Sequence, residues 1–385
     1  MTGSIKLVAK PKYEVAQIVH QFSQDYHQQY KVPWQVSKTL NAIGLCRTAA
    51  LGGHTDACTN CGTVSQSYNS CRNRHCPKCQ ATNRERWIEA RERELLPVPY
   101  YHVVFTLPHC FNELLPKYAK EVYNSLFTAS WQTIQAFAAD PKFLGAKTGM
   151  VAVLHTWGQQ LWLHPHVHCI VPGGGITKAG KWKNCKYNDK YLYPRGALSS
   201  KFRGRFMELI RQKIDVPQSI AKAAFDKNWV VYAKRPFATP KTVVEYLGRY
   251  THKVAISNHR LTNVDTENVT FRYKDYKSEA TKKVATISGV EFLRRFAHHV
   301  LPQGFMRIRH YGFLAGRNKP KELNIAKADL GQDAWEKLEI SWQQLAEEKL
   351  SIKPNTCPHC KTQTMVCIAM QDAPRGPPKT NKITL

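Results

Sequence analysis

The chain has 385 residues, 43% of them hydrophobic, and carries 56 Lys and Arg against 28 Asp and Glu residues, a formal net charge of +28. Such a charge favours polyanionic partners, because each phosphate that a basic side chain neutralises releases counterions. No apolar run approaches the ~18–20 residues that span a bilayer, and the first residues lack the apolar core of a signal peptide. We therefore expect a cytoplasmic protein that binds nucleic acid and makes no membrane contact.

Patterns typical of helices and strands follow one another in mixed order. Helical spacing or helix-start signals occur at Tyr13–Tyr30, Arg84–Leu96, Leu114–Phe137, from Thr239-Pro240 onward, and at Gly289–Val300. Strand patterns occur at Tyr101–Leu107, Met150–His155, His166–Val171, Phe271–Tyr276, Val284–Ile287 and Met306–His310. This order predicts an α+β fold around one central antiparallel sheet.

The same patterns divide the chain into four segments. We expect a helical segment over residues 1–50 and a cysteine-rich domain with a linker helix over 51–96. Residues 97–320 contain the predicted sheet, with a less patterned insertion at 176–239, and residues 321–385 form a basic tail.

Two C-x2-C pairs, Cys58 with Cys61 and Cys76 with Cys79, predict a structural zinc site. Zn²⁺ prefers tetrahedral sulfur ligands, and a cytoplasmic chain keeps its thiols reduced. Cys71 and His75 lie in the same loop, and either could replace one of the four ligands or help to form a second site.

Basic residues surround this cysteine cluster. Arg72, Arg74 and Lys78 are expected to contact DNA phosphates, although basic residues on small zinc modules are often only solvated. Cys357 and Cys360, with His359 and Cys367 nearby, form a second candidate zinc knuckle whose metal binding the spacing leaves open.

A strand with alternating histidines is the most informative segment. His166 and His168 point to one face of this strand while Val167 points into the core, because successive strand residues alternate. Two imidazoles leave a coordination sphere open, and His155 or Gln159 on the preceding strand and loop could supply a third ligand. Such a set would suit Mg²⁺ or Mn²⁺ bound to phosphate oxygens.

Two tyrosines, Tyr246 and Tyr250, lie one turn apart on a predicted helix. Tyr250 borders an apolar stripe, whereas Tyr246 lies among polar and basic residues that include Arg249 and Lys253. A phenol is a poor nucleophile at neutral pH, so attack on a phosphate would need a metal or a nearby cation. Arg249 and Lys253 are therefore candidate DNA contacts.

One motif resembles a nucleotide-binding loop but lacks an essential residue. Gly175-x4-Gly180-Lys181 is followed by Trp182, where a Ser or Thr would have to reach Mg²⁺. We expect no nucleotide cofactor.

Several segments, taken in order, resemble the IS91 family of insertion-sequence transposases. These segments are Tyr68–Gln80, Leu96–Pro108, His164–His168, Tyr246–Ser257 and Arg307–Gly312. The resemblance implies a bacterial, nucleoid-associated HUH endonuclease, named for two histidines around a hydrophobic residue. It implies a catalytic domain over 97–320, with a sheet like that of RNA-recognition or ferredoxin-like folds, and a small N-terminal zinc domain.

The resemblance also implies roles for the candidate residues. Tyr246 and Tyr250 would be the two nucleophiles of rolling-circle transposition, each forming a 5′-phosphotyrosine link with single-stranded DNA at an element end. His166 and His168 would hold the metal that polarises the scissile phosphate. Two alternatives remain: a plasmid rolling-circle initiator or relaxase with the same chemistry, and a non-catalytic zinc protein that binds DNA. The sequence leaves the oligomeric state open.

Overall fold

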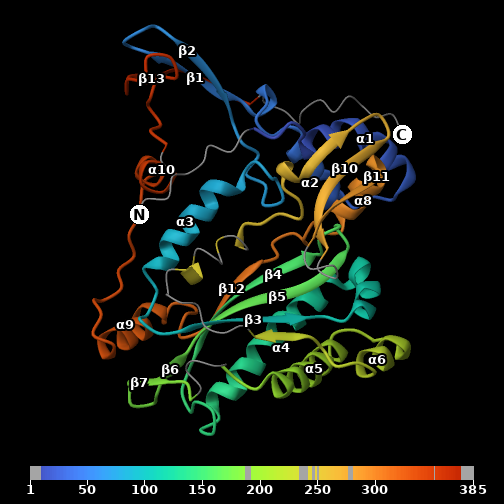
Figure 1. The fold of residues 1–385 in the computed structure, drawn as a ribbon, viewed down its shortest axis with the longest axis vertical. Helices are drawn as coiled ribbons and strands as arrows, with labels where there is room; N and C mark the ends of the chain where they lie inside the picture. Colours follow the sequence, from blue (N-terminus) through green and yellow to red (C-terminus); the bar gives the residue numbers. More distant parts are fainter. Residues whose placement is uncertain are drawn as a thin grey trace.

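The computed structural model describes residues 10–186, 192–233, 242–244, 248, 251–275, 281–350 and 352–373 (Figure 1). The helices are α1 (Val15–Gln29), α2 (Trp34–Gly44), α3 (Gln80–Glu92), α4 (Leu115–Ala139), α5 (Arg195–Arg211), α6 (Gln218–Phe225), α8 (Gly289–Ala297), α9 (Lys319–Asp329) and α10 (Trp342–Leu350). Short 3-10 helices are η1 (Ala49–Leu51), η2 (His109–Leu114) and η3 (Asn258–Arg260). Among these residues no helix is both long and apolar enough to cross a membrane.

The strands form antiparallel sheets. They are β1 (Gly53–Cys58), β2 (Val64–Tyr68), β3 (Tyr100–Thr106), β4 (Gly149–Trp157), β5 (Leu163–Pro172), β6 (Gly174–Ile176), β7 (Trp182–Asn184), β8 (Val231–Ala233), β9 (Leu261–Val264), β10 (Asn268–Asp275), β11 (Thr281–Ser288), β12 (Ile308–Gly312) and β13 (Met365–Gln371). The largest sheet has the order β12-β4-β5-β3-β8, and each neighbouring pair is antiparallel. The expected α+β fold with a central antiparallel sheet is confirmed.

The two faces of the central sheet pack against different partners. Val103, Phe105 and Val167 point to one face and join a hydrophobic core with α4 and α5. Val151 and Ile170 point to the other face and pack with residues at and near α9. The insertion thus contributes α5, which covers the first face, and the edge strand β8.

A second hydrophobic core joins the N-terminal helices to the later part of the predicted catalytic domain. Helices α1 and α2 pack with α8, β9 and β10. Phe22 of α1 lies so close to Gly289 that a Cβ atom there would stand 2.3 Å from the Phe22 ring. The backbone N–H of Val15 donates to Asn258 Oδ1 at 3.1 Å. The helical segment expected over residues 1–50 therefore shares its core with residues beyond 255.

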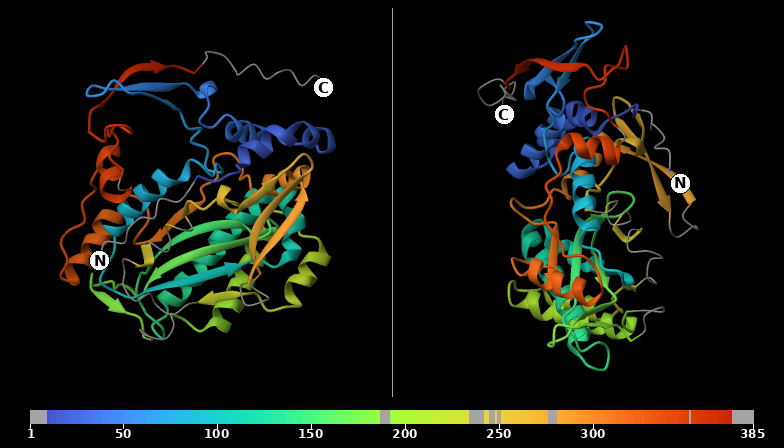
Figure 2. Two further views of the ribbon diagram at one scale, coloured as in Figure 1. Left: turned by 45° about the horizontal axis from the view of Figure 1, so that its top comes forward. Right: turned by 90° about the vertical axis from the view of Figure 1, so that its left-hand side faces the viewer.

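A three-stranded sheet of order β13-β1-β2 forms an arm of the molecule (Figures 1 and 2). Strand β13 pairs with β1 over the register Gly53 to Gln371 through Cys58 to Met365. Part of the segment expected to be a C-terminal tail therefore belongs to the sheet of the N-terminal cysteine region. Sequence reasoning missed this pairing because nothing local to β13 identifies a partner strand so far away.

Candidate functional site

The central sheet gathers histidines on one face. His155 of β4 lies directly opposite His166 of β5, and His168 follows two residues later on the same side. Val167, between the two β5 histidines, is fully buried in the core on the other side. The predicted alternation along this strand is confirmed, and it depends only on the two-residue period of strands.

His155, His166 and His168 have the geometry of a metal site. Their ligand atoms all lie within 4.8 Å of one another. The ring centroids of His155 and His168 are 4.6 Å apart, and those of His166 and His168 are 4.8 Å apart. His155 and His168 are 3% and 7% exposed, whereas His166 is half-buried. Three converging imidazoles, one of them partly exposed to solvent, could bind a divalent cation and leave coordination positions for a substrate.

Hydrogen bonds orient two of these rings. Nδ1 of His166 lies 2.6 Å from the carbonyl oxygen of His164, to which it can only donate. Nδ1 of His168 lies 2.9 Å from Nε2 of His102, a buried residue of β3 on the same sheet face. With Nδ1 engaged, Nε2 is the nitrogen with which either imidazole would bind a metal.

The protonation state also favours metal binding. Burial, followed by the nearby His164, lowers the pKa of His166 to about 3. Burial, followed by His155, holds the pKa of His168 well below its usual range. Both rings are therefore neutral near pH 7, which is the form that binds metals.

Of the two expected third ligands, His155 belongs to this group. The side-chain oxygen of Gln159 instead accepts from the backbone N–H of Lys274 at 3.3 Å. The backbone carbonyl of Gln159 accepts from the Arg260 guanidinium. These bonds hold Gln159 against β10 and η3.

The expected nucleophiles Tyr246 and Tyr250, and Arg249 beside them, lie outside the described residues. The described residues around them contact the histidine-bearing face of the sheet. Val243 and Val244 are buried and line a small pocket with Val151 and Ile170. On the other side, Lys253 lies close enough to His166 and His168 for its positive charge to help lower their pKa values.

A groove of about 250 Å³ lies beside Lys253. Its lining includes apolar residues, the polar residues Gln80 and His252, and the cationic residues Arg84, Lys253 and Arg260. Partial desolvation, followed by the charges of Arg260 and Lys274, lowers the pKa of Lys253. Several cations crowded into one groove favour an anionic ligand.

The cysteines form two groups, and the two C-x2-C pairs expected to make one site are divided between them. Cys46, Cys71, Cys76 and Cys79 make one group, and Cys58, Cys61, Cys357 and Cys360 make the other, with sulfur atoms in each group within 4.8 Å of one another. The two C-x2-C pairs therefore belong to different groups. Chain separation between the pairs is short, but β1 and β2 carry the first pair away from the second along the arm (Figure 1).

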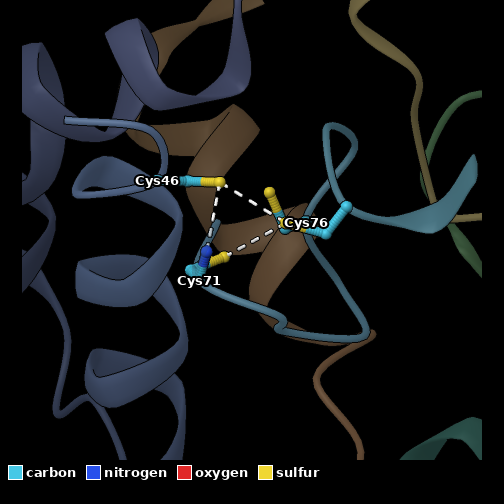
Figure 3. Close-up of side chains that lie close together, drawn as sticks. Cys46, Cys71 and Cys76 are labelled. Carbon is cyan, nitrogen blue, oxygen red and sulfur yellow. Dashed lines mark hydrogen bonds between the residues drawn. The ribbon is translucent and has the colours of Figure 1, made fainter. Parts of the chain in front are cut away.

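The first group lies at the edge of the second hydrophobic core. Cys46 follows α2, and its sulfur faces those of Cys71 and Cys76 from the neighbouring loop (Figure 3). Cys46 and Cys76 are fully buried, and the sulfur of Cys79 lies 3.4 Å from that of Cys46. A hydrogen bond from Cys71 is the main cause that lowers the pKa of Cys46 to about 7. Sequence reasoning missed Cys46, because a lone cysteine has no spacing signal.

His75, an alternative ligand in the sequence, does not join either group. It is buried, and its Nε2 accepts from the backbone N–H of Leu301 at 3.4 Å. This contact ties the cysteine loop to the segment after α8.

The basic residues of the cysteine loop have different surroundings. Arg72 is exposed. Arg74 donates to the backbone carbonyls of Pro302 and Phe305, which directs its guanidinium into the protein. Lys78 pairs with Glu14 at 2.6 Å between Nζ and Oε2. Of the three expected DNA contacts in this loop, Arg72 alone has an exposed side chain.

Comparisons with known proteins identify the family. The family described as "Transposase zinc-binding domain" matches residues 18–107, and the one described as "Putative transposase" matches residues 149–322. The chain is 41% identical to "Putative transposase y4qJ" of Sinorhizobium fredii over 97% of this chain and 99% of that protein. The chain belongs to the IS91 family of transposases.

A second relative supports this assignment. The transposase is 30% identical to "Transposase for insertion sequence element IS801" of Pseudomonas savastanoi pv. phaseolicola, over 73% of this chain and 70% of that protein. No solved structure is significantly similar to it. The match over residues 18–107 contains the entire first cysteine group, which supports a structural Zn²⁺ in this transposase.

Proposed function

We propose that this transposase nicks and rejoins single-stranded DNA at the ends of its insertion element by rolling-circle transposition. Tyr246 and Tyr250 act as nucleophiles, and His155, His166 and His168 hold a divalent metal. The observation that carries the proposal is the convergence of three imidazoles on the sheet face that also carries Val151 and Ile170, which line a pocket with Val243 and Val244, just before the tyrosines in the chain.

The donor set fits a divalent cation. Two of its rings are fixed by hydrogen bonds through Nδ1, and burial keeps His166 and His168 neutral. When bound there, the metal would polarise the scissile phosphate. Imidazole nitrogen is softer than the oxygen ligands that Mg²⁺ prefers, so we expect Mn²⁺ to support cleavage at lower concentration than Mg²⁺.

The chain's own residues supply the remaining parts of the reaction. The cations of the groove, Arg84, Lys253 and Arg260, would bind the DNA backbone next to the scissile phosphate. The phenol oxygen of one tyrosine attacks phosphorus and loses its proton, the P–O3′ bond breaks, and the 3′ oxygen leaves as a hydroxyl.

The 5′-phosphotyrosine link conserves the energy of the broken phosphodiester. Attack by a 3′ hydroxyl on the link reverses the step, releases the phenol and joins the strand. Rejoining therefore needs no nucleotide cofactor. Two tyrosines allow two such links to form in turn, which transfer of an element from one site to another requires.

The test is a cleavage assay on single-stranded oligonucleotides that contain the element ends, labelled at the 3′ end. We expect a labelled protein–DNA adduct that survives denaturation, because the 5′ phosphate of the downstream fragment becomes attached to the protein. Tyr246→Phe and Tyr250→Phe are each expected to reduce strand transfer, and the double variant to form no adduct.

Two outcomes would contradict the proposal. One is the absence of any adduct on all single-stranded element ends with Mn²⁺ or Mg²⁺ present. The other is full strand transfer by the double tyrosine variant. Tyr30→Phe, which changes an exposed tyrosine at the end of α1, is the matched control and should cleave like the unmodified protein.

A further inference from the structure

The second cysteine group joins two parts of the chain that are far apart in sequence. Cys58 and Cys61 lie at the turn between β1 and β2, and Cys357 and Cys360 lie in the turn that precedes β13. The sulfur atoms of Cys58 and Cys360, 302 residues apart, lie at 3.6 Å. Those of Cys61 and Cys357, 296 residues apart, also lie at 3.6 Å. The family match over residues 18–107 includes only the first half of this group.

The two halves of the group have the same backbone turn. The N–H of Cys58 donates to the carbonyl of Thr63 at 2.9 Å, and that of Cys357 donates to the carbonyl of Thr362 at 2.8 Å. The N–H of the residue after the second cysteine, Gly62 or Lys361, donates back to the carbonyl of the first cysteine at 2.9 Å or 3.1 Å. Each half thus folds its own C-x2-C pair into a tight turn that presents both sulfurs to the same side.

The residue after the second cysteine adopts a left-handed conformation in both halves. Its φ angle is 71° at Gly62 and 62° at Lys361. Glycine adopts this region readily, but for lysine it is uncommon. A lysine held there indicates that the turn at 357–361 is fixed by its surroundings rather than by local preference.

Polar hydrogens surround the sulfurs. The backbone N–H groups of Cys61 and His359 each lie 3.4 Å from the sulfur of the first cysteine in their own turn. Hydroxyl groups of Thr364, Thr362 and Thr63 lie 3.0, 2.9 and 3.1 Å from the sulfurs of Cys58, Cys360 and Cys61. Donors of this kind stabilise thiolates, which are the form in which cysteine binds metals.

We propose that Cys58, Cys61, Cys357 and Cys360 bind a second structural Zn²⁺, which clasps strand β13 to the β1–β2 hairpin. Four sulfurs from two matching turns are the donor set of a closed, tetrahedral zinc site. The site is independent of the first group, whose ligands all come from residues 46–79. Tying two points about 300 residues apart stabilises the folded chain, because the unfolded chain loses the entropy of a long open loop.

The clasp has a consequence for the segment between α9 and β13. Helix α10 contacts α3, where Nζ of Lys349 lies 2.8 Å from Oε2 of Glu92. An ion pair of this kind contributes little to stability when partly exposed. The zinc and the β1–β13 ladder therefore add to the attachment that α10 supplies through its buried Leu345 and Ala346.

The first experiment is a cobalt titration of the full chain after its metals have been removed under reducing conditions. Only thiolate ligands give the sulfur-to-cobalt charge-transfer band, so the histidine group does not contribute to it. We expect this band to saturate at two equivalents for the unmodified protein and at one for the Cys357→Ser/Cys360→Ser variant. Cys367→Ser, which changes an exposed cysteine of β13 outside both groups, is the control and should saturate at two.

Saturation at one equivalent in the unmodified protein would overturn the proposal, as would two equivalents in the double variant. The saturation point of the unmodified protein needs no substitution, so the proposal can be tested even if the double variant does not fold. Two disulfides among these four cysteines in the protein as isolated, before any reductant is added, would also contradict it.

A second experiment tests the clasp itself. A protease site inserted among the exposed residues 336–339 allows the chain to be cut after it has folded. We expect the two fragments to co-elute in zinc and to separate after the Cys357→Ser/Cys360→Ser change. Separation in the unmodified, zinc-loaded sequence would show that no clasp exists.

Discussion

The histidine group and the cysteine groups both gather metal-binding side chains, but they do so by different routes. His155, His166 and His168 are neighbours in one β-ladder, so the strand period and the hairpin register alone bring them together. The cysteine groups need α2, a loop, a hairpin and a strand near the other end of the chain to come together. The histidine group is therefore determined by a short stretch of sequence, whereas the cysteine groups depend on the fold of the whole chain.

The largest expected effect is on the histidine group. His166→Ala or His168→Ala removes a donor from a set of three, and we expect cleavage of single-stranded element ends to fall at least ~100-fold. The thermal midpoint of His166→Ala should change little, since this residue is only half-buried. Rate measurements with His259→Ala, an exposed residue of η3, provide the control. Wild-type cleavage by both β5 variants would show that the histidine face is not the active site.

The cysteine groups should differ from each other in their effect on stability. Cys46→Ser weakens a site whose ligands are buried in a hydrophobic core, so we expect it to lower the free energy of unfolding by several kcal/mol, on the order expected for loss of a structural metal. Cys360→Ser acts on the exposed arm and should cost less. Thermal unfolding of both variants compares them, and a larger loss for Cys360→Ser would reverse this ranking.

A smaller effect is expected at His102. This residue touches no predicted substrate, and its role would be to position His168 through the 2.9 Å contact between their nitrogens. His102→Phe fills the same volume without a hydrogen bond, and we expect Mn²⁺ affinity to fall by ~10–100-fold. Calorimetric titration measures this affinity. Unchanged affinity, with folding intact, would mean that His102 only fills space.

The smallest expected effect concerns acid stability away from the metal group. Burial lowers the pKa of His299 from 6.5 to about 4, so the unfolded chain takes up this proton before the folded one does. The stabilisation is present above pH ~6.5 and is lost as pH falls toward ~4, by about 2 kcal/mol at pH ~5. The free energy of unfolding in urea, measured at pH ~6.5 and pH ~5, should therefore depend less on pH for His299→Gln than for the unmodified chain. An equal dependence would contradict this reading.

Much of the central sheet could be predicted from sequence because its strands are marked by alternation. The β4–β5 hairpin, the outward face of His166 and His168, and the buried position of Val167 all follow from a two-residue period. His155 could be proposed as a third ligand for the same reason, since antiparallel register places it opposite His166. The hydrogen bond between Gln159 and β10 could not be predicted, because it depends on tertiary packing.

The cysteine pairing could not be predicted because C-x2-C spacing indicates a half-site but not its partner. Two adjacent pairs look like one complete site, and only the fold shows that Cys58 and Cys61 face Cys357 and Cys360 instead. The sequence offered one signal for this pairing: Cys357 and Cys360 form a third C-x2-C pair, which needs two more ligands to complete a zinc site. Arg74 and Lys78 were predicted as DNA contacts from charge, but their bonds to Pro302, Phe305 and Glu14 arise from packing.

The central claim is that three histidines of one β-ladder hold a divalent metal. Pulsed electron paramagnetic resonance of the Mn²⁺-loaded chain tests it most directly, because nitrogen nuclei of bound imidazoles couple to the metal's electron spin. We predict imidazole couplings in the unmodified protein and their loss in the variant with His155, His166 and His168 all replaced by Ala. Mn²⁺ bound without nitrogen couplings, or couplings that persist in the triple variant, would contradict the claim.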